Sequence, residues 1–130
     1  MTTALKIRFV DNLSRLATVA DRARRRYLYR AAAYVRTTAR RSIRRRKSPS
    51  APNSPPSTRT GRLKKAIRFY VDQARGLALV GPSVDVVGPA GAEHEHGGQW
   101  RDEHFAPRPY MGPAYELTRP KLPDFYRQSF

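Results

Sequence analysis

The feature that most constrains the fold is a long stretch without helix-breaking residues. Between Leu13 and Ser48 the 130-residue chain contains neither Gly nor Pro, the two residues that most strongly disfavour a helix interior. At 100° per residue, the apolar and small side chains of this stretch fall on one stripe. Its members are Leu13, Leu16, Ala17, Ala20, Tyr27, Ala31, Tyr34, Val35 and Thr38. The pattern predicts a single helix of about thirty residues, capped by Asp11 or Asn12.

Arginine side chains occupy the opposite side of this predicted helix. We define the following residues as the basic ridge and predict that it faces a partner or DNA: Arg22, Arg25, Arg26, Arg36, Arg40, Arg44, Arg45 and Arg46. Arg24 departs from this arrangement, because it projects near the middle of the apolar stripe. Three explanations are open: the helix bends there, the side chain snorkels beside Asp21, or a partner supplies a carboxylate.

The basic ridge belongs to a block without acidic residues. Residues 22–71 carry 17 Arg and Lys and no Asp or Glu, a formal charge of +17 against +16 for the whole chain. Such a block repels itself, so we expect nucleic acid or an acidic protein surface to compensate it. A solvated charged face without a dedicated partner is the alternative. Tyr27, Tyr29 and Tyr34 are interleaved with the arginines and are candidates for stacking on nucleic-acid bases.

Residues 48–60 form a proline-rich segment that can continue neither a helix nor a central strand. We predict an extended assembly loop here, mobile or ordered by a partner, and name as its functional residues Pro49, Pro52, Pro55, Pro56 and Arg59. Loops of this length inside a compact domain are uncommon and often functional.

Short alternating segments predict strands. Leu5, Ile7 and Phe9 alternate with Lys6 and Arg8, which indicates a short strand before the long helix. Three further strands are predicted over 63–72, 76–80 and 84–87, joined by turns at 73–76 and 81–83. The alternation of the first of these is out of phase at residues 65 and 66. Together they predict an antiparallel meander on which the long helix lies.

The rest of the chain predicts irregular structure followed by a helix. Residues 90–109 are rich in turn-forming residues, whereas Pro109 and Pro113 stand where a helix can begin. We expect that final helix to be interrupted near Pro120 and Pro123, with 117–130 as C-terminal helix and tail. The prediction is one α+β domain over 1–130: a long N-terminal helix on a small, mostly antiparallel sheet, a Pro-rich extended loop and a shorter C-terminal helix.

Several function classes are disfavoured by the sequence. The chain has no Cys, which removes thiol catalysis and Cys-based metal sites and fits a reducing compartment. It has no apolar run of the ~18 residues that a membrane helix needs, so we expect a soluble protein. No nucleophile elbow, Walker loop or dinucleotide fingerprint is present, so we expect no enzyme and no cofactor.

One cluster has metal-capable side chains: Glu93, His94, Glu95 and His96, followed by Asp102, Glu103 and His104. If residues 93–96 were a strand, His94 and His96 would share one face and could act as two zinc ligands, with His104 or a carboxylate as the third. The spacing matches no zinc motif of defined geometry, however. We therefore predict no metal, and a polar loop whose carboxylates pair with arginines.

Three motifs stand in a recognisable order: TGRLKKAI at 60–67, EHGG at 95–98 and RPYMGPAYE at 108–116. Glycine supplies backbone conformations closed to other residues, and proline fixes the approach to a helix. We predict architectural roles for Gly61, Leu63, Ile67, Gly97, Pro109, Tyr110, Met111 and Pro113, with Tyr110 and Met111 filling the core or a neighbour. In order and spacing the motifs resemble the small neck or tail-completion proteins of long-tailed bacteriophages and prophages, over roughly residues 5–122.

The resemblance implies a structural virion protein of the head–tail junction, assembled in the host cytoplasm. It implies a homo-oligomeric ring, a hexamer by analogy, between connector or stopper proteins and the tail terminator or tube, with DNA passing non-specifically through its lumen. His96 replaces the usual aromatic residue, and the helix is richer in arginine than is typical of the family. A dense arginine lining would grip passing DNA, which favours an acidic protein as partner of the ridge. The alternative function is a stand-alone basic nucleic-acid-binding protein.

Overall fold

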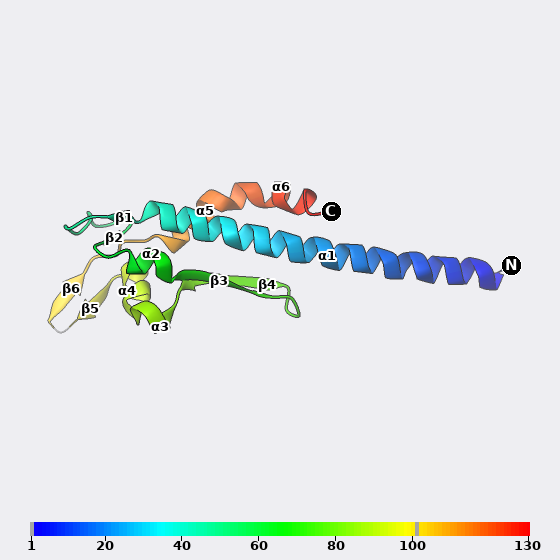
Figure 1. The fold of residues 1–130 in the computed structure, drawn as a ribbon, viewed down its shortest axis with the longest axis horizontal. Coiled ribbons are helices and arrows are strands. Elements are labelled where there is room, and N and C mark those ends of the chain that lie inside the picture. The colour runs from blue at the N-terminus through cyan, green and yellow to red at the C-terminus, as the bar shows by residue number, and fades with distance from the viewer. Residues whose placement is uncertain (1, 101) are drawn as a thin grey trace.

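The protein is built around one long N-terminal helix, against which a β-hairpin and the C-terminal helices pack. The computed structural model describes residues 2–100 and 102–130, and it confirms the predicted α+β class (Figure 1). The elements are, in chain order, α1 (Thr2–Ser42), β1 (Arg44–Arg45), β2 (Ser57–Thr58), α2 (Arg62–Ala66), β3 (Ile67–Asp72), β4 (Leu77–Pro82), α3 (Val84–Val87), α4 (Ala90–His96), β5 (Gly98–Trp100), β6 (Glu103–Phe105), α5 (Met111–Thr118), the 3₁₀ turn η1 (Arg119–Lys121) and α6 (Leu122–Arg127).

Helix α1 is longer than the sequence predicted. It runs for 41 residues from Thr2, so the strand predicted over Leu5–Phe9 is wrong, and Asp11 and Asn12 lie inside the helix instead of capping it. Three alternating apolar positions are a weak signal for a strand. No Gly or Pro separates them from the residues of the long helix, so the helix continues through them.

The two halves of α1 have different surroundings. Every side chain from Leu13 to Arg22 is exposed, and Leu13 and Leu16 keep 49% and 63% of their surface accessible. From Leu13 onward, Ala23 is the first buried residue. Figure 1 shows the N-terminal half of α1 extending away from the other elements, which lie along its C-terminal half or beyond its C-terminal end. We call residues 13–22 the bare segment of α1.

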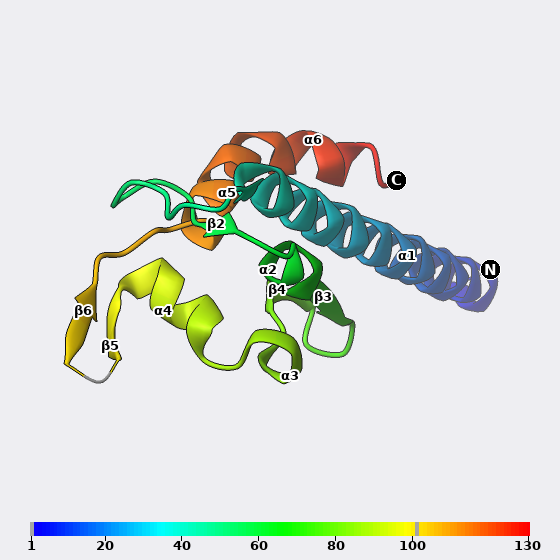
Figure 2. The same ribbon diagram turned by 60° about the vertical axis from the view of Figure 1, so that its left-hand side comes forward.

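The buried stripe of α1 differs from the predicted one. From Leu28 onward its buried residues are spaced three or four apart, as a helix face requires: Leu28, Ala32, Val35, Ala39 and Ile43, the last just after the helix end. Of the predicted stripe only Val35 is buried, whereas Leu13 and Leu16 are exposed. The reason is that α1 is covered from two sides, by the hairpin β3–β4 and by α5–α6, as Figures 1 and 2 both show.

The core lies where these covers meet the C-terminal end of α1. Residues of α2, β3 and α5, which belong to the TGRLKKAI and RPYMGPAYE motifs, pack there with residues of α1. The buried residues of the core are Val35, Ala39, Ile43, Leu63, Ile67, Tyr110 and Ala114. Partly buried Val80, Val87 and Met111 pack against it. The core cluster therefore draws its side chains from α1 and the residue after its end, from the TGRLKKAI motif and from the start of α5.

The predicted meander is replaced by three separate two-stranded sheets. The hairpin β3–β4 is antiparallel, with Ile67 opposite Pro82 and Asp72 opposite Leu77, and its turn closes through a hydrogen bond from Gly76 N to Gln73 O (3.3 Å). The predicted turn at 73–76 is thus confirmed. The phase break at residues 65 and 66 marks the boundary between α2 and β3, because residues 62–66 are helical.

The strand predicted over 84–87 is wrong, because these residues form the single turn α3. Val86 N and Val87 N donate to Ser83 O (3.1 and 3.2 Å), which closes the turn. Ser83 N also donates to Ala66 O (2.8 Å), so the backbone after β4 is held against α2 and no longer continues the hairpin. The apolar run alone could not distinguish a short strand from one helical turn.

Residues 90–109 are more regular than predicted. They contain helix α4 and the antiparallel pair β5–β6, so the expectation of an irregular stretch is wrong. Pro89 stands at the N-cap of α4, and Gly97, at φ 75°, ends the helix. The glycines and the proline that made the segment look irregular therefore act as its boundaries.

The C-terminal prediction is confirmed. Helix α5 begins after Tyr110, the 3₁₀ turn η1 contains Pro120, and α6 contains Pro123 in its first turn. This helical stretch packs along α1 through ring contacts, with centroids 5.5 Å apart for Tyr27 and Tyr126 and 5.3 Å apart for Tyr34 and Phe125.

Candidate functional site

The basic ridge is divided into three parts, because the hairpin β3–β4 covers its middle. Arg36 lies with its guanidinium carbon 4.7 Å from the centre of the Phe69 ring, a cation–π contact. Arg40 Nη2 donates to Ile67 O (2.7 Å). Burial, together with the charges of Arg36 and Arg68, lowers the pKa of Arg40 below its ordinary value. These two arginines hold the hairpin on α1 and do not face solvent as the other ridge residues do.

The first part of the ridge is exposed. Arg22, Arg25, Arg26 and Tyr29 line an open hollow of about 560 Å³ on α1. Arg26 Nη1 also donates to Ser129 O (3.3 Å), which fixes the C-terminal end of the chain to the helix. The ring of Tyr29 meets that of Phe69 edge to face at 6.0 Å. The three tyrosines proposed for stacking on bases thus have aromatic partners inside the chain.

None of the three predicted explanations fully accounts for the position of Arg24. Its Nη2 donates to Gln73 O (3.0 Å) in the turn of the hairpin, and it lies 3.9 Å from Asp21 Oδ1. The Cβ that Gly76 lacks would stand 3.3 Å from Arg24 Nη1, so this glycine leaves room for the arginine. Arg24 joins the hairpin turn to α1, with only a long, exposed contact to Asp21.

The assembly loop is anchored at both ends. Strands β1 and β2 pair in parallel, Arg44 with Ser57 and Arg45 with Thr58, and so close the loop at its base. Pro56 is among the most deeply buried side chains. Away from the base, Asn53 N donates to Pro107 O (2.8 Å). The extended path is as predicted, and this chain's own β6–α5 connection supplies contacts that hold it.

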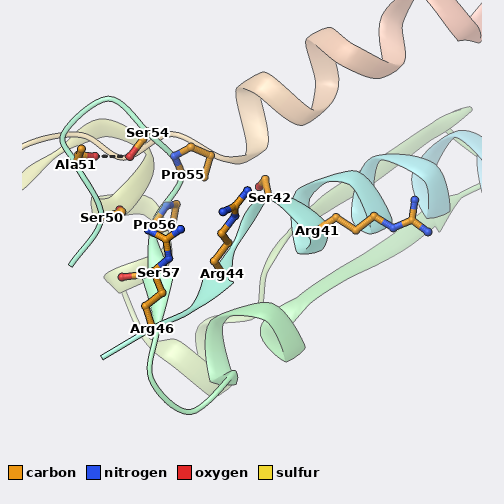
Figure 3. Close-up of a pocket in the computed structure, with 10 residues that line it drawn as sticks. All are labelled: Arg41, Ser42, Arg44, Arg46, Ser50, Ala51, Ser54, Pro55, Pro56 and Ser57. Atoms are coloured by element: carbon orange, nitrogen blue, oxygen red, sulfur yellow. Dashed lines mark hydrogen bonds between the residues drawn. The ribbon is translucent and has the colours of Figure 1, made fainter. Parts of the chain in front are cut away.

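The third part of the ridge stands beside this loop. Arg45 Nε donates to Arg59 O (2.9 Å), and Arg59 Nε donates to Lys47 O (3.2 Å). Arg44 and Arg46 lie on the other side of β1, because successive side chains of a strand alternate. They line a pocket of about 460 Å³ between the end of α1 and the loop, and their side chains point the same way (Figure 3).

The TGRLKKAI motif has the architectural role that was predicted. Gly61 has φ 81°, a conformation that favours glycine, and its N–H donates to Thr58 Oγ1 (3.1 Å). Leu63 and Ile67 are buried in the core cluster. Arg62 Nη2 reaches across to Val86 O (2.7 Å). The motif therefore turns the chain from the loop into α2 and places two apolar side chains against α1.

Glu95 is the residue whose role sequence reasoning missed. Its carboxylate accepts hydrogen bonds from three consecutive backbone N–H groups at the start of α5: Tyr110 (2.8 Å) and Met111 (2.9 Å) to Oε2, and Gly112 (2.8 Å) to Oε1. Pro113 has no N–H, and Ala114 N donates to Tyr110 O (3.2 Å). All the unpaired donors of this helix start are thus satisfied.

The sequence contains a signal for this cap. Glu95 opens the EHGG motif, and proline at the third helical position leaves only the preceding N–H groups in need of an acceptor. The Cβ that Gly112 lacks would stand 2.9 Å from Glu95 Oε1, so Gly112 allows the carboxylate to approach. The two motifs are parts of one hydrogen-bonded unit.

Tyr110 fills the core, as predicted. It is fully buried, and its hydroxyl donates to Gly91 O (3.0 Å). Burial, with a smaller effect of Glu95, raises the pKa of Tyr110 to about 12. Gly97, at φ 75°, completes this region, since an added Cβ would lie 2.9 Å from Phe105 O. Met111 is half-buried against the same cluster, and Pro109 is half-buried just before the helix.

The metal-capable cluster is dispersed. His94 and His96 lie on a helix, not on a strand, and among the residues that the structure describes no three His, Asp or Glu side chains are placed to hold a metal ion. Burial, then the nearby Arg108, lower the pKa of His94, against an opposing effect of Glu93.

Few charges of the basic block are neutralised within the chain. Among the side chains that the structure describes, those of residues 13–99 and 102–130, the ion pairs are all between residues three apart: Arg24–Asp21, Arg75–Asp72, Arg119–Glu116 and Arg127–Asp124. The expectation that the carboxylates of residues 93–104 pair with arginines is wrong for Glu95, which caps α5. No helix of the described part of the chain is both long enough and apolar enough to span a membrane.

Comparisons with protein-family models, with curated proteins and with solved structures found no match to this chain. The resemblance to phage neck proteins stays a prediction from the three motifs. The candidate functional surfaces are those that the geometry leaves open: the bare segment of α1, the exposed arginines of its middle, and the arginine-lined pocket beside the assembly loop.

Proposed function

We propose that the chain is a structural subunit of the bacteriophage neck, a tail-completion or head–tail joining protein that forms a ring around the DNA channel. In the virion its neighbours would be copies of itself, the connector or stopper on one side, and the tail terminator or tube on the other. The chain would assemble in the host cytoplasm, and its role would be mechanical, with no catalysis or cofactor.

The observation that carries the proposal is the bare segment of α1. Single helices gain most of their stability from packing, and an amphipathic helix without a cover is marginal in water. Leu13, Leu16 and Val19 are exposed at 49%, 63% and 49%, and Figure 1 shows the N-terminal half of α1 extending away from the other elements. An assembly subunit whose helix is covered by its neighbours accounts for this arrangement.

Two further observations support an assembly role. The residues of the three motifs act in packing and capping, as a scaffold requires. The positive charge of residues 22–71 is largely uncompensated within the chain, so an assembly with acidic proteins or with DNA would stabilise it.

The experiment is a measurement of assembly state by native mass spectrometry, with electron microscopy of the purified protein. We expect a closed ring, and we expect Leu13→Glu with Leu16→Glu to release monomers that remain folded by circular dichroism. The matched control is Val84→Glu with Leu117→Glu, which alters two comparably exposed apolar residues outside α1 and should leave the ring intact. A wild-type protein that stays monomeric at high concentration and binds duplex DNA tightly would instead support the stand-alone DNA-binding function.

A further inference from the structure

A second surface feature is independent of the bare segment: a cationic groove beside the assembly loop. The pocket of about 460 Å³ adjoins another of about 340 Å³, and the two share Arg46, Ser50 and Ser57 in their walls. We call the two pockets together the loop groove. The cations in its walls are Arg41, Arg44, Arg46, Lys47, Arg59 and Arg108, and no carboxylate lines it.

The strand geometry of β1 leaves two guanidinium groups of this groove free. Figure 3 shows Arg44 and Arg46 pointing in the same direction, toward the loop, whereas Arg41 extends along α1 away from it. Neither Arg44 nor Arg46 has a hydrogen-bond acceptor or a carboxylate partner among the described residues. Each guanidinium presents a planar set of donors that matches a phosphate group. Like charges held side by side without a counter-ion favour the binding of an anion.

Other arginines of the groove are anchored but keep free donors. Arg108 Nε donates to Ser50 O (2.9 Å), and Arg59 Nε donates to Lys47 O (3.2 Å). Contact through Nε leaves terminal N–H groups of these guanidinium groups for a ligand, although Arg108 Nη1 also lies 3.5 Å from Ala106 O. The same contacts fix the loop, so the groove is formed before any ligand arrives.

A buried hydroxyl without a partner belongs to Ser50, a residue that the walls of both pockets share. Ser50 Oγ is inaccessible to solvent and has no hydrogen-bond partner among the described residues, although Ser50 lines both pockets. The hydroxyls of Ser54 and Ser57, by contrast, donate to Ala51 O and Ser48 O. A buried polar atom without a partner is costly, so a native structure rarely keeps one without a reason. A ligand oxygen supplied to this wall would satisfy it after a small movement.

We propose that the loop groove binds the phosphodiester backbone of nucleic acid. An acidic protein segment is the competing ligand, but protein interfaces depend on buried apolar and aromatic anchors. The groove offers cations and hydroxyls instead, with Phe105 as its one large aromatic wall residue among those described. Backbone contacts of this kind carry no base sequence, so the binding is non-specific. The proposal stands whether or not the chain belongs to a phage neck, since the bare segment takes no part in it.

The test is fluorescence anisotropy with a labelled 20-base-pair duplex and a labelled 20-base single strand, over a series of NaCl concentrations. We expect Arg44→Gln with Arg46→Gln to lower affinity at least tenfold. The slope of log affinity against log salt should fall by about 1.8 for the duplex and about 1.4 for the single strand, since each of the two lost phosphate contacts contributes roughly 0.9 and 0.7 respectively. Binding of either form supports the proposal, and the ratio of affinities identifies which form the groove prefers.

The matched control is Arg119→Gln with Arg127→Gln, which removes the same charge from exposed positions outside the groove. We expect it to change affinity less than threefold and to leave the salt slope unchanged. Equal losses in the two double variants would overturn the proposal, because net charge alone would then explain binding. Tighter binding of a labelled poly-glutamate peptide than of DNA, lost in the groove variant, would overturn it in favour of an acidic protein.

Ser50→Ala separates a binding role from a structural one. Since the hydroxyl has no partner in the free protein, its removal should leave the melting temperature unchanged or higher. If the hydroxyl donates to a phosphate, DNA affinity should nevertheless fall about two- to fivefold. A lower melting temperature with unchanged affinity would contradict this role of Ser50. Arg44→Lys with Arg46→Lys keeps the charge and should lose affinity while keeping the salt slope.

Discussion

The two halves of α1 share one continuous helix and have opposite surroundings. In the bare segment every side chain is exposed, whereas from Leu28 to Ile43 the helix supplies a buried stripe to the core. Both halves contain Ala, Leu and Arg and lack Gly and Pro. The difference teaches that local sequence decides where this helix runs, while the elements that follow in the chain decide which of its faces is covered.

The largest expected effect separates the halves directly. Ala39→Asp places a carboxylate at a fully buried position and should lower the free energy of unfolding by about 3–5 kcal/mol. Ala17→Asp makes the same change in the bare segment and should alter the stability of the monomer by less than about 0.5 kcal/mol. Urea denaturation followed by circular dichroism measures both. Similar losses at the two positions would contradict the comparison.

Alkaline pH should act, through Tyr110, on the core that covers the second half of α1. The pKa of Tyr110 is raised to about 12 in the folded protein, against 10 when the chain unfolds. The unfolded state therefore loses its proton first, and stability present below pH 10 falls between pH 10 and 12, by about 2–3 kcal/mol in total. Unfolding free energies measured against pH should lose this component in Tyr110→Phe. An unchanged profile in that variant would show that other groups cause the decline.

Weakening the cover of the second half should have a smaller effect. Glu95→Gln keeps the shape of the side chain but removes the charge that accepts three N–H groups of α5. We expect a loss of about 1–3 kcal/mol in thermal or urea unfolding. Glu116→Gln, at an exposed ion pair on the same helix, should cost less than about 1 kcal/mol. A Glu95 effect no larger than that of Glu116 would contradict the capping role.

The ring contacts between α1 and α6, which we call the aromatic seam, should contribute still less to the unfolding free energy. Phe125→Leu removes the ring that contacts Tyr34 at 5.3 Å and lies under Arg30 at 4.9 Å. We expect a loss of about 0.5–1.5 kcal/mol in unfolding free energy beyond the change in buried area. Tyr70→Leu, at an exposed hairpin position, is the control. If both variants lose the same unfolding free energy, the ring contacts between α1 and α6 do not contribute to stability.

The smallest effect on the monomer is expected in the bare segment. Leu13→Gln with Leu16→Gln should change the unfolding free energy of a dilute, unassembled sample by less than about 0.5 kcal/mol, since neither side chain is buried. Assembly, measured in parallel by native mass spectrometry, should be lost. A marked destabilisation of the monomer would indicate that the segment packs against its own chain.

The sequence predicted the parts of the fold that depend on local signals. The absence of Gly and Pro predicted a long helix, and four prolines predicted the extended loop. Gly61 and Gly97 were expected to adopt conformations that favour glycine, and both have positive φ. Pro120 and Pro123 were expected to interrupt the last helix, and a 3₁₀ turn lies there. Each of these follows from the backbone chemistry of one or two residues.

The sequence failed where the outcome depends on distant partners. The buried stripe was misplaced because two covers, from residues 67–82 and 111–127, decide which face is buried. Arg36 and Arg40 were assigned to an exposed ridge, since nothing in α1 indicates that Phe69 and Ile67 O lie above them. The cap by Glu95 was missed because it joins residues 15–17 positions apart. Contacts between residues distant in the sequence cannot be predicted from the pattern of any single segment.

The length of α1 has a mechanical consequence. A continuous helix of 41 residues spans about 60 Å at 1.5 Å per residue, and roughly half of that length lies beyond the body of the subunit. Because no Gly or Pro interrupts it, this rod resists bending. Whatever binds near Thr2 is thus held at a set separation from the core around Tyr110. The helix therefore sets the distance between a partner bound at its N-terminal end and the core of the subunit. Adding or removing whole turns would change that distance without altering either the partner or the core.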